Sequence, residues 1–228
     1  MQFNNKKVII FDLDGTLIDS VPDLAVSVNH TLQTLGMAQY NNDAIRYWVG
    51  NGVRVLVKRA LLGSVDTTPD VDKALFNKAL DIFLEHYASH LAITTTLYPN
   101  VVSTLQTLKR EGYRLVIVTN KPFDFVEPIL KGLGISDLFE FYLGGDSLKE
   151  KKPSPLPLLY VCDRCNILAN EALMVGDSKN DILSANSANI ESIGVTYGYN
   201  YGEPIESYDP NAIVDDFGEI TTLIGAKS

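Results

Sequence analysis

Polar residues suited to phosphoryl transfer follow several short apolar runs of this chain. Asp12 and Asp14 come directly after the run at residues 8–11. The other candidates are Thr119 and Asn120 after residues 115–118, Lys152 in the loop after 141–143, and Asp177 and Asp181 after 173–175. Phosphoryl transfer depends mainly on positioning and charge neutralisation, so carboxylates, a hydroxyl and an ammonium group gathered at one place would suit it.

The residue types suggest a role for each candidate. Hydrolysis of a phosphate monoester is very slow without catalysis, and a covalent aspartyl-phosphate would divide it into two easier steps. Asp12 is the predicted nucleophile, and Asp14 is the predicted acid for the leaving alkoxide and base for the attacking water. The Thr119 hydroxyl and the Asn120 backbone N–H would bind phosphoryl oxygens, and Lys152 would neutralise charge.

A metal ion is also expected, because a bare acidic cluster would repel a phosphate. Carboxylate oxygens suit Mg²⁺, which accepts few protein ligands and reverses the sign of the local field. Asp12 and Asp177 are the predicted side-chain ligands.

Each residue also has a simpler interpretation. Asp12 and Asp14 could be turn residues, residues 119–120 a strand end, Lys152 a solvated cation, and Asp177 with Ser178 a helix N-cap. Independent turn residues have no reason to supply a nucleophile, an acid, an oxyanion anchor and a metal ligand at successive strand ends. The combined pattern therefore favours catalysis.

The apolar runs predict an α/β fold. They are rich in β-branched residues and short, as expected of strands buried on both faces, and they lie at 8–11, 115–118, 141–143, 173–175 and 192–195. Helical patterns such as 101–111, which Gly112 would end, separate them. This alternation predicts a doubly wound, mainly parallel, Rossmann-like sheet, which binds ligands beyond the carboxyl ends of its strands.

One segment interrupts the alternation. Between about residues 20 and 90 only helical patterns occur, at 23–35, 53–62 and 71–87. We expect an inserted helical cap domain at 18–90 and a catalytic core formed by 1–17 and 91–228, with 91–99 as the return linker.

Composition limits the possible partners and compartments. The chain has 228 residues, 46% of them hydrophobic, and a net charge of −9, and it shows no basic stripe of the kind that nucleic-acid binding needs. No apolar run approaches the roughly 20 residues that span a bilayer. We therefore expect no nucleic-acid or membrane partner and a cytoplasmic location. We also expect a monomer or weak homodimer.

The cysteines form a single C-x-x-C pair, Cys162 and Cys165. A redox centre or half of a zinc site is the alternative to a structural role. The pair lies late in the predicted helix 156–165, away from the N-terminus that lowers a thiol pKa, and the chain has no second cysteine pair. Both alternatives are disfavoured.

These residues resemble the motifs of the haloacid dehalogenase superfamily. The matching segments are 12–20, 118–121, 152–153 and 176–181, and the resemblance covers essentially the whole chain. It implies that the first strand is central and that the cap closes over the site. It further implies that the backbone carbonyl of Asp14 also binds the metal and that Asp181 supports the metal shell. Members that remove halide lack a carboxylate at the position of Asp14, so dehalogenation is disfavoured.

Residues 48–52 and 196–203 carry a narrower resemblance, to the subfamily of bacterial phosphoglycolate phosphatases. It implies hydrolysis of 2-phosphoglycolate to glycolate and phosphate. The alternatives are a phosphatase for another small phosphate ester, a sugar-phosphate isomerase similar to β-phosphoglucomutase, and a regulatory protein without activity. The intact set of catalytic residues argues against the last.

Recognition of so small an anion would require donors from the cap. The turn formed by Gly50, Asn51 and Gly52 has free backbone N–H groups at the start of the 53–62 helix, and Arg54 is nearby. The alternative is an ordinary turn and a solvated arginine. A tyrosine-rich stretch, with Tyr197, Tyr199 and Tyr201, could shape the pocket or an interface, but we expect ordinary loop packing and no catalytic role.

Overall fold

The computed structural model, which describes residues 3–224, contains a six-stranded parallel sheet. The strands are β1 (Val8–Phe11), β4 (Arg114–Val118), β5 (Phe141–Leu143), β6 (Ala172–Gly176), β7 (Glu191–Val195) and β8 (Ala212–Val214), in the order β5-β4-β1-β6-β7-β8. The predicted parallel sheet with a central first strand is confirmed. Strand β8, which has three residues and lies at the edge of the sheet, was not predicted.

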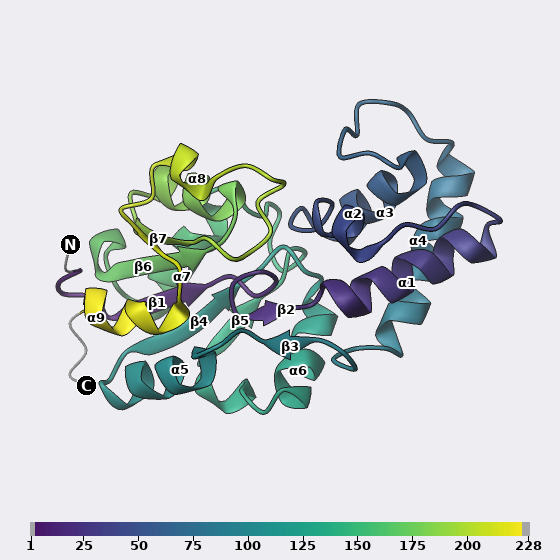
Figure 1. Cartoon of the computed structure of the whole chain (residues 1–228). Helices are drawn as coiled ribbons and strands as arrows, with labels where there is room; N and C mark the ends of the chain where they lie inside the picture. The colour runs from purple at the N-terminus through teal and green to yellow at the C-terminus, as the bar shows by residue number, and fades with distance from the viewer. Residues whose placement is uncertain (1–2, 225–228) are drawn as a thin grey trace.

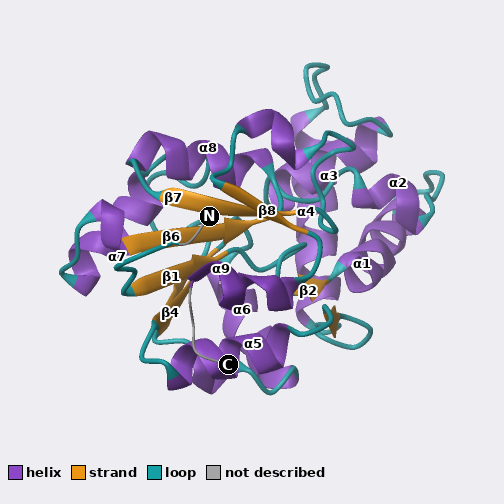
Figure 2. Ribbon diagram, turned by 60° about the vertical axis from the view of Figure 1, so that its left-hand side comes forward, coloured by secondary structure: helices purple, strands orange, loops and turns teal. Residues whose placement is uncertain are grey.

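Helices cover both faces of this sheet, as Figure 2 shows. They are α5 (Val101–Arg110), α6 (Phe123–Gly132), α7 (Leu156–Cys165), α8 (Lys179–Ala188) and the short α9 (Ile220–Ile224). Alternate residues of β1 enter different cores: Ile9 lies in the core that contains residues of α5 and α6, whereas Ile10 lies in the core that contains residues of α7 and α8. The central strand is therefore buried on both faces, which explains its continuous apolar run.

A group of helices lies to one side of the sheet (Figure 1). It comprises α1 (Val21–Thr34), α2 (Asn42–Arg46), α3 (Val53–Leu62) and α4 (Lys73–Ala88). The two connections to the sheet region pair with each other, as antiparallel strands β2 (Ile18–Asp19) and β3 (Thr96–Leu97). Helix α2 and these short strands were missed because a few residues are too few to establish a period.

Short 3-10 turns complete the described chain, at Ser136–Leu138, Ala169–Glu171, Ile205–Tyr208 and Phe217–Glu219. Within residues 3–224, no helix has both the length and the apolar character needed to cross a membrane. The outer ends of the expected core ranges, at 1–2 and 225–228, lie outside the described residues.

Asp23, in the first turn of α1, holds residues 93–95 of the return linker against that helix through hydrogen bonds. The residue is 3% exposed, and its carboxylate accepts hydrogen bonds from the backbone N–H groups of residues 93–95, at 3.0, 2.8 and 3.0 Å. The hydroxyls of Thr94 and Thr95 also donate to it. Burial favours the protonated acid, but these donors outweigh it and lower the pKa of Asp23.

We therefore expect Asp23→Ala to lower the free energy of unfolding by about 2–4 kcal/mol, because several donors lose a charged acceptor. Chemical denaturation at neutral pH measures this. Since folding lowers the pKa of Asp23, its contribution is present above the aspartate pKa of the unfolded chain and is lost as the pH falls through the folded value. The control is Asp43→Ala, an exposed aspartate in α2. Equal losses in both variants would contradict this assignment.

Candidate active site

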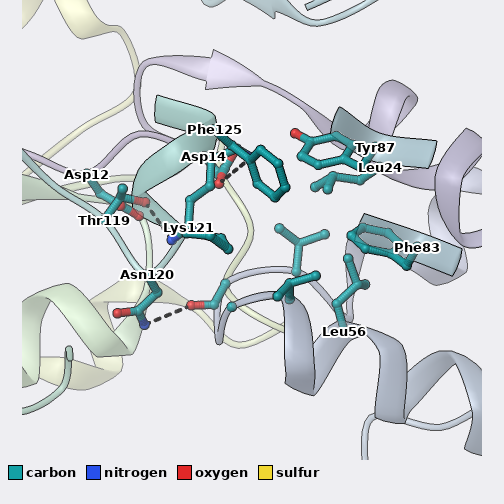
Figure 3. Close-up of a pocket in the computed structure, with 15 residues that line it drawn as sticks. Asp12, Asp14, Leu24, Leu56, Phe83, Tyr87, Thr119, Asn120, Lys121 and Phe125 are labelled. Atoms are coloured by element: carbon teal, nitrogen blue, oxygen red, sulfur yellow. Dashed lines mark hydrogen bonds and ion pairs between the residues drawn. The ribbon is translucent and has the colours of Figure 1, made fainter. Parts of the chain in front are cut away.

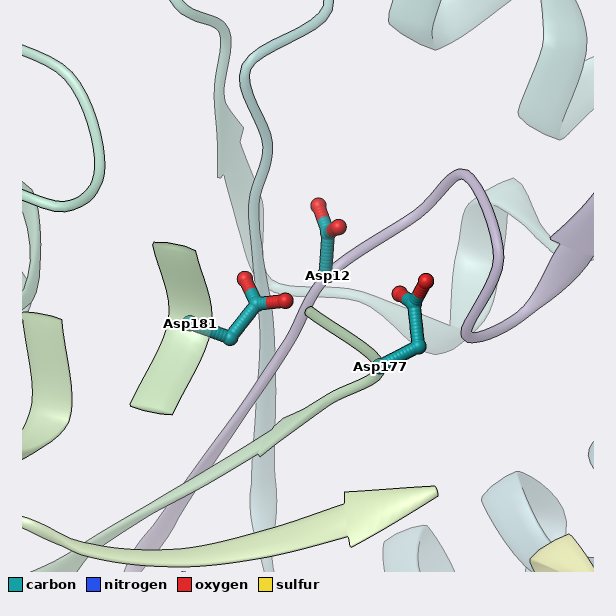
Figure 4. A group of neighbouring side chains, drawn as sticks. All are labelled: Asp12, Asp177 and Asp181. Carbon is teal, nitrogen blue, oxygen red and sulfur yellow. The ribbon is translucent and has the colours of Figure 1, made fainter. Parts of the chain in front are cut away.

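The carboxyl ends of the three central strands bring the first candidates together. Asp12, Thr119 and Asp177 directly follow β1, β4 and β6, and β1 lies between the other two. All three side chains are buried. Carboxylate oxygens of Asp12, Asp177 and Asp181 lie within 4.8 Å of one another, and Figure 4 shows the three carboxylates around one space.

Lys152 is the ammonium group of this cluster. Its Nζ lies 2.9 Å from Asp12 Oδ1 and 2.6 Å from Asp181 Oδ1, and the residue is only 2% exposed. The Asn120 amide donates to the backbone carbonyl of Lys152 at 3.0 Å, which ties the loop after β5 to the end of β4. The interpretation of Lys152 as a solvated cation is therefore wrong.

Neighbouring backbone and hydroxyl groups orient Asp177. The Thr16 hydroxyl donates to Oδ1 at 2.7 Å and the backbone N–H of Tyr199 donates to Oδ2 at 2.6 Å. Gly15 has φ of +92°, and a Cβ there would lie 2.2 Å from Asp177 Oδ2, so only glycine fits beside the carboxylate. Sequence reasoning assigned no such roles to Thr16 and Tyr199, although both stand in the segments it singled out.

Asp181 is held at the first turn of α8. Its Oδ2 accepts from the backbone N–H of Ser178 at 3.0 Å and from the Ser178 hydroxyl at 2.8 Å. Ser178 is therefore the N-cap of α8, as the simpler interpretation held, and the same capping box aims Asp181 at Lys152. With both oxygens engaged, Asp181 is placed to support the cluster.

The cluster carries more negative charge than its protein surroundings neutralise. Burial raises the pKa of Asp12 to about 7, against the opposing effect of Lys152. Burial, with Asp181 and Asp12 nearby, also raises the pKa of Asp177 well above its usual range. Buried oxygen ligands with excess negative charge are a donor set for a hard divalent cation, so these residues fit one.

Asp14 belongs to a second group of contacts (Figure 3). Its Oδ1 and Oδ2 lie 2.9 and 3.1 Å from Lys121 Nζ, and the Ser20 hydroxyl donates to Oδ1 at 2.5 Å. Lys121 is 5% exposed. The contacts of Lys121 and Ser20 with Asp14 were not predicted from the sequence, although both residues lie in the matching segments 12–20 and 118–121. The predicted metal contact of Asp14 concerns its backbone carbonyl, whereas its side chain faces Lys121.

A pocket extends from Asp12, Asp14, Thr119, Asn120 and Lys121 toward the helices beside the sheet. The rest of its lining is mostly apolar and consists of Leu24, Val49, Val53, Leu56, Phe83, Tyr87, Pro122 and Phe125. Those residues come from α1, α3, α4, α6 and adjoining turns. A small ester would thus meet polar groups at the strand ends and an apolar wall elsewhere.

Of the residues of the helical region that were predicted to recognise the substrate, some line the pocket and others do not. Gly50 and Gly52 line the pocket, and the Gly50 carbonyl accepts from the side-chain amides of Asn120 at 3.1 Å and Asn180 at 3.2 Å. The Asn51 carbonyl accepts from Lys151. Arg54 is exposed, with its guanidinium 4.9 Å from the centre of the Phe76 ring, and the structure does not bring it to the pocket.

The tyrosines of the 196–203 loop form hydrogen bonds with three neighbouring segments of the chain. The Tyr199 hydroxyl donates to Asp19, and the Tyr201 hydroxyl accepts from the Asn180 amide at 3.0 Å. Tyr197 donates to the Thr16 carbonyl at 2.9 Å. These contacts fix neighbouring segments of the site and assign the tyrosines no chemical step.

The cysteine pair takes no part in the site. Cys162 and Cys165 are free thiols, buried in α7. Burial raises the pKa of Cys162 to about 11, so the reactive thiolate is disfavoured.

A family model described as haloacid dehalogenase-like hydrolase matches residues 9–195, a range that spans Asp12 to Asp181. The chain belongs to this family. It is 52% identical over the full length of both chains to a curated phosphoglycolate phosphatase of Colwellia psychrerythraea. It is 49% identical, over 96% of each chain, to one of Psychrobacter arcticus.

The fold of this haloacid dehalogenase-like hydrolase also matches a solved structure, a predicted phosphoglycolate phosphatase from Haemophilus somnus. The TM-score is 0.91 with 42% identity, and the match covers 96% of this chain and 98% of the other. Family membership establishes that the chain is a hydrolase of this superfamily with its characteristic α/β core.

Proposed function

We propose that this chain is a Mg²⁺-dependent phosphatase that hydrolyses 2-phosphoglycolate to glycolate and phosphate. The observation that carries the proposal is Asp12, which lies at the end of the central strand, 2.9 Å from Lys152 and in one pocket with Asp14. The substrate is taken from relatives such as the Colwellia protein, named phosphoglycolate phosphatase and matched over its whole length.

The placement of these side chains supports a reaction in two steps. An oxygen of Asp12 attacks the phosphorus in line, and the bond from phosphorus to the leaving oxygen breaks as Asp14 gives that oxygen a proton. The Thr119 hydroxyl, the Asn120 N–H and Lys152 bind the phosphoryl oxygens. Asp14, now ionised, takes a proton from water, which attacks the aspartyl-phosphate, releases phosphate and restores Asp12.

Mg²⁺ is the proposed cation for the carboxylate cluster. Asp12 and Asp177 would hold it with the backbone carbonyl of Asp14, and Asp181 would support this shell through Lys152 and Ser178. When bound, Mg²⁺ would neutralise charge on the phosphoryl group and keep Asp12 ionised.

Substrate selection is assigned to the helices. We propose that residues 18–90 form a cap over the core built from 1–17 and 91–228, and that the turn at Gly50, Asn51 and Gly52 closes the pocket over the substrate. The hydrogen bonds from Asn120 and Asn180 to the Gly50 carbonyl support this placement. Arg54 reaches the substrate only if its side chain leaves Phe76.

We further propose a cytoplasmic location and a monomer or weak homodimer that acts on a small phosphate ester, without nucleic-acid or membrane partners. The free cysteines support a reducing compartment.

A panel of phosphate esters incubated with Mg²⁺ tests the proposed function. We expect the highest kcat/KM for 2-phosphoglycolate, measured as released phosphate. Higher kcat/KM for another small ester would transfer the assignment to that ester. Interconversion of sugar phosphates without phosphate release would replace it with an isomerase similar to β-phosphoglucomutase.

The acid role of Asp14 predicts a loss that depends on the leaving group. Asp14→Asn should lower kcat for 2-phosphoglycolate by about 10²–10⁴-fold, because its alkoxide needs a proton. Release of the first product from p-nitrophenyl phosphate, whose phenolate leaves unaided, should fall much less in a pre-steady-state burst. Equal losses on the two esters would contradict the acid role.

A further inference from the structure

The Tyr87 hydroxyl is a buried polar group that the reaction above does not use. Tyr87 belongs to α4, is 1% exposed, and lines the pocket across from Asp14 and Lys121. Its hydroxyl has no hydrogen-bond partner among the described residues. A buried hydroxyl without a partner is costly, so its place at the wall of a ligand pocket points to a partner in the ligand.

The Tyr87 ring is held firmly. It packs edge-to-face on Phe125, with centroids 5.2 Å apart, and stacks with Phe83 at 5.6 Å. Figure 3 shows its oxygen on the side of the ring that faces Asp14 and Phe125. The ring is therefore fixed on two sides, and the direction of the hydroxyl is set before a ligand arrives.

The charges nearby decide which ligand group this hydroxyl would meet. Lys121 Nζ lies 5.0 Å from the centre of the Tyr87 ring, and Lys121 is the only Lys, Arg or His side chain among the described residues that line the pocket. Burial raises the pKa of Tyr87 to about 12, so the group remains a hydrogen-bond donor. Lys121 is paired with the Asp14 carboxylate, at 2.9 and 3.1 Å, but Asp14 is neutral when it carries the proton that it gives to the leaving group. A donor next to an ammonium group whose charge is then unopposed favours an anionic partner.

Two other unpartnered atoms line the pocket, and both are acceptors: Asp12 Oδ1, which forms an ion pair with Lys152, and Asn120 Oδ1. Asn120 Oδ1 is buried without a partner, while its amide nitrogen donates to the carbonyls of Gly50 and Lys152. An amide oxygen accepts hydrogen bonds and repels a carboxylate oxygen. Tyr87 is thus the unpartnered side-chain donor of the described pocket.

We propose that Tyr87, assisted by Lys121, binds the anionic group of the substrate that is not transferred, and so selects small phosphate esters bearing a carboxylate. This inference rests on the proposed function, and it names the groups that would bind the carboxylate of 2-phosphoglycolate. It places recognition on α4 and on the residue after Asn120, in addition to the turn at residues 50–52.

Tyr87→Phe tests this, because it removes only the hydroxyl and keeps the ring. Binding is measured in the Asp12→Asn background with Mg²⁺, so that no turnover intervenes. The probes are 2-phosphoglycolate and ethyl phosphate, which has a methyl group in place of the carboxylate. We expect the Kd for 2-phosphoglycolate to rise about tenfold to a hundredfold, as for a lost hydrogen bond to a charged group, with ethyl phosphate changed less than about twofold.

Tyr98→Phe is the matched control, since the Tyr98 hydroxyl is also buried without a partner but does not line the pocket. It should leave both Kd values unchanged. Equal weakening of both probes by Tyr87→Phe, no weakening of either, or no preference of the parent protein for 2-phosphoglycolate would each overturn the inference. Preferential binding of 2-phosphoglycolate without its hydrolysis by the wild-type enzyme would instead refute the proposed function alone.

Discussion

Asp12→Asn is expected to reduce turnover of 2-phosphoglycolate by at least about 10⁴-fold, a loss typical of removing a catalytic nucleophile. The amide has nearly the shape of the carboxylate but cannot attack phosphorus. Burial already raises the pKa of Asp12 to about 7 in the absence of a cation, so the neutral side chain suits the fold. The variant should therefore remain folded and melt at or above the wild-type temperature in metal-free buffer.

Two measurements test whether Asp12 is the nucleophile. Rapid acid quenching and mass spectrometry of the wild-type enzyme should place a phosphoryl group on Asp12, and the variant should show none. Asp43→Asn, at an exposed aspartate of α2, should behave as wild type. Near-normal activity of Asp12→Asn, or phosphorylation at another residue, would refute the nucleophile assignment.

Removal of divalent cations should lower activity to background, and added Mg²⁺ should restore it. The carboxylates of Asp12, Asp177 and Asp181 lie within 4.8 Å of one another, with Lys152 as the ammonium in contact with two of them. Without a cation Asp12 is substantially protonated near neutral pH, since its pKa is about 7, and a protonated carboxyl is a poor nucleophile. Full activity after exhaustive chelation would show that catalysis does not need a divalent cation.

The same cluster predicts how stability depends on pH and metal. Folding raises the pKa of Asp12 from 3.8 to about 7, so the folded chain binds more protons and the cation-free protein loses stability as the pH rises across that interval. Mg²⁺ should raise the melting temperature, and more at pH 7.5 than at pH 5, because only the ionised cluster binds it. Asp177→Asn should reduce this shift.

Local sequence patterns determined the strands and the order of the catalytic candidates. A strand buried on both faces needs a continuous apolar run, so residues 8–11, 115–118 and 173–175 could be predicted to be strands without any tertiary information. Once these strands were parallel, their carboxyl ends had to share one edge, which placed Asp12, Thr119 and Asp177 together. The two-residue strands β2 and β3 are too short to show a period, and the edge strand β8 was also missed.

Only the tertiary structure decided the partners of those residues. The ion pair of Lys121 with Asp14 joins positions 107 apart, and Tyr199 reaches Asp19 across 180 positions. Nothing in a local pattern encodes such pairs, because they arise where separately formed elements pack. For the same reason Tyr87 was only the last residue of a predicted helix, and Arg54 only a candidate for substrate recognition, until the packing of α3 and α4 placed the first in the pocket and the second on Phe76.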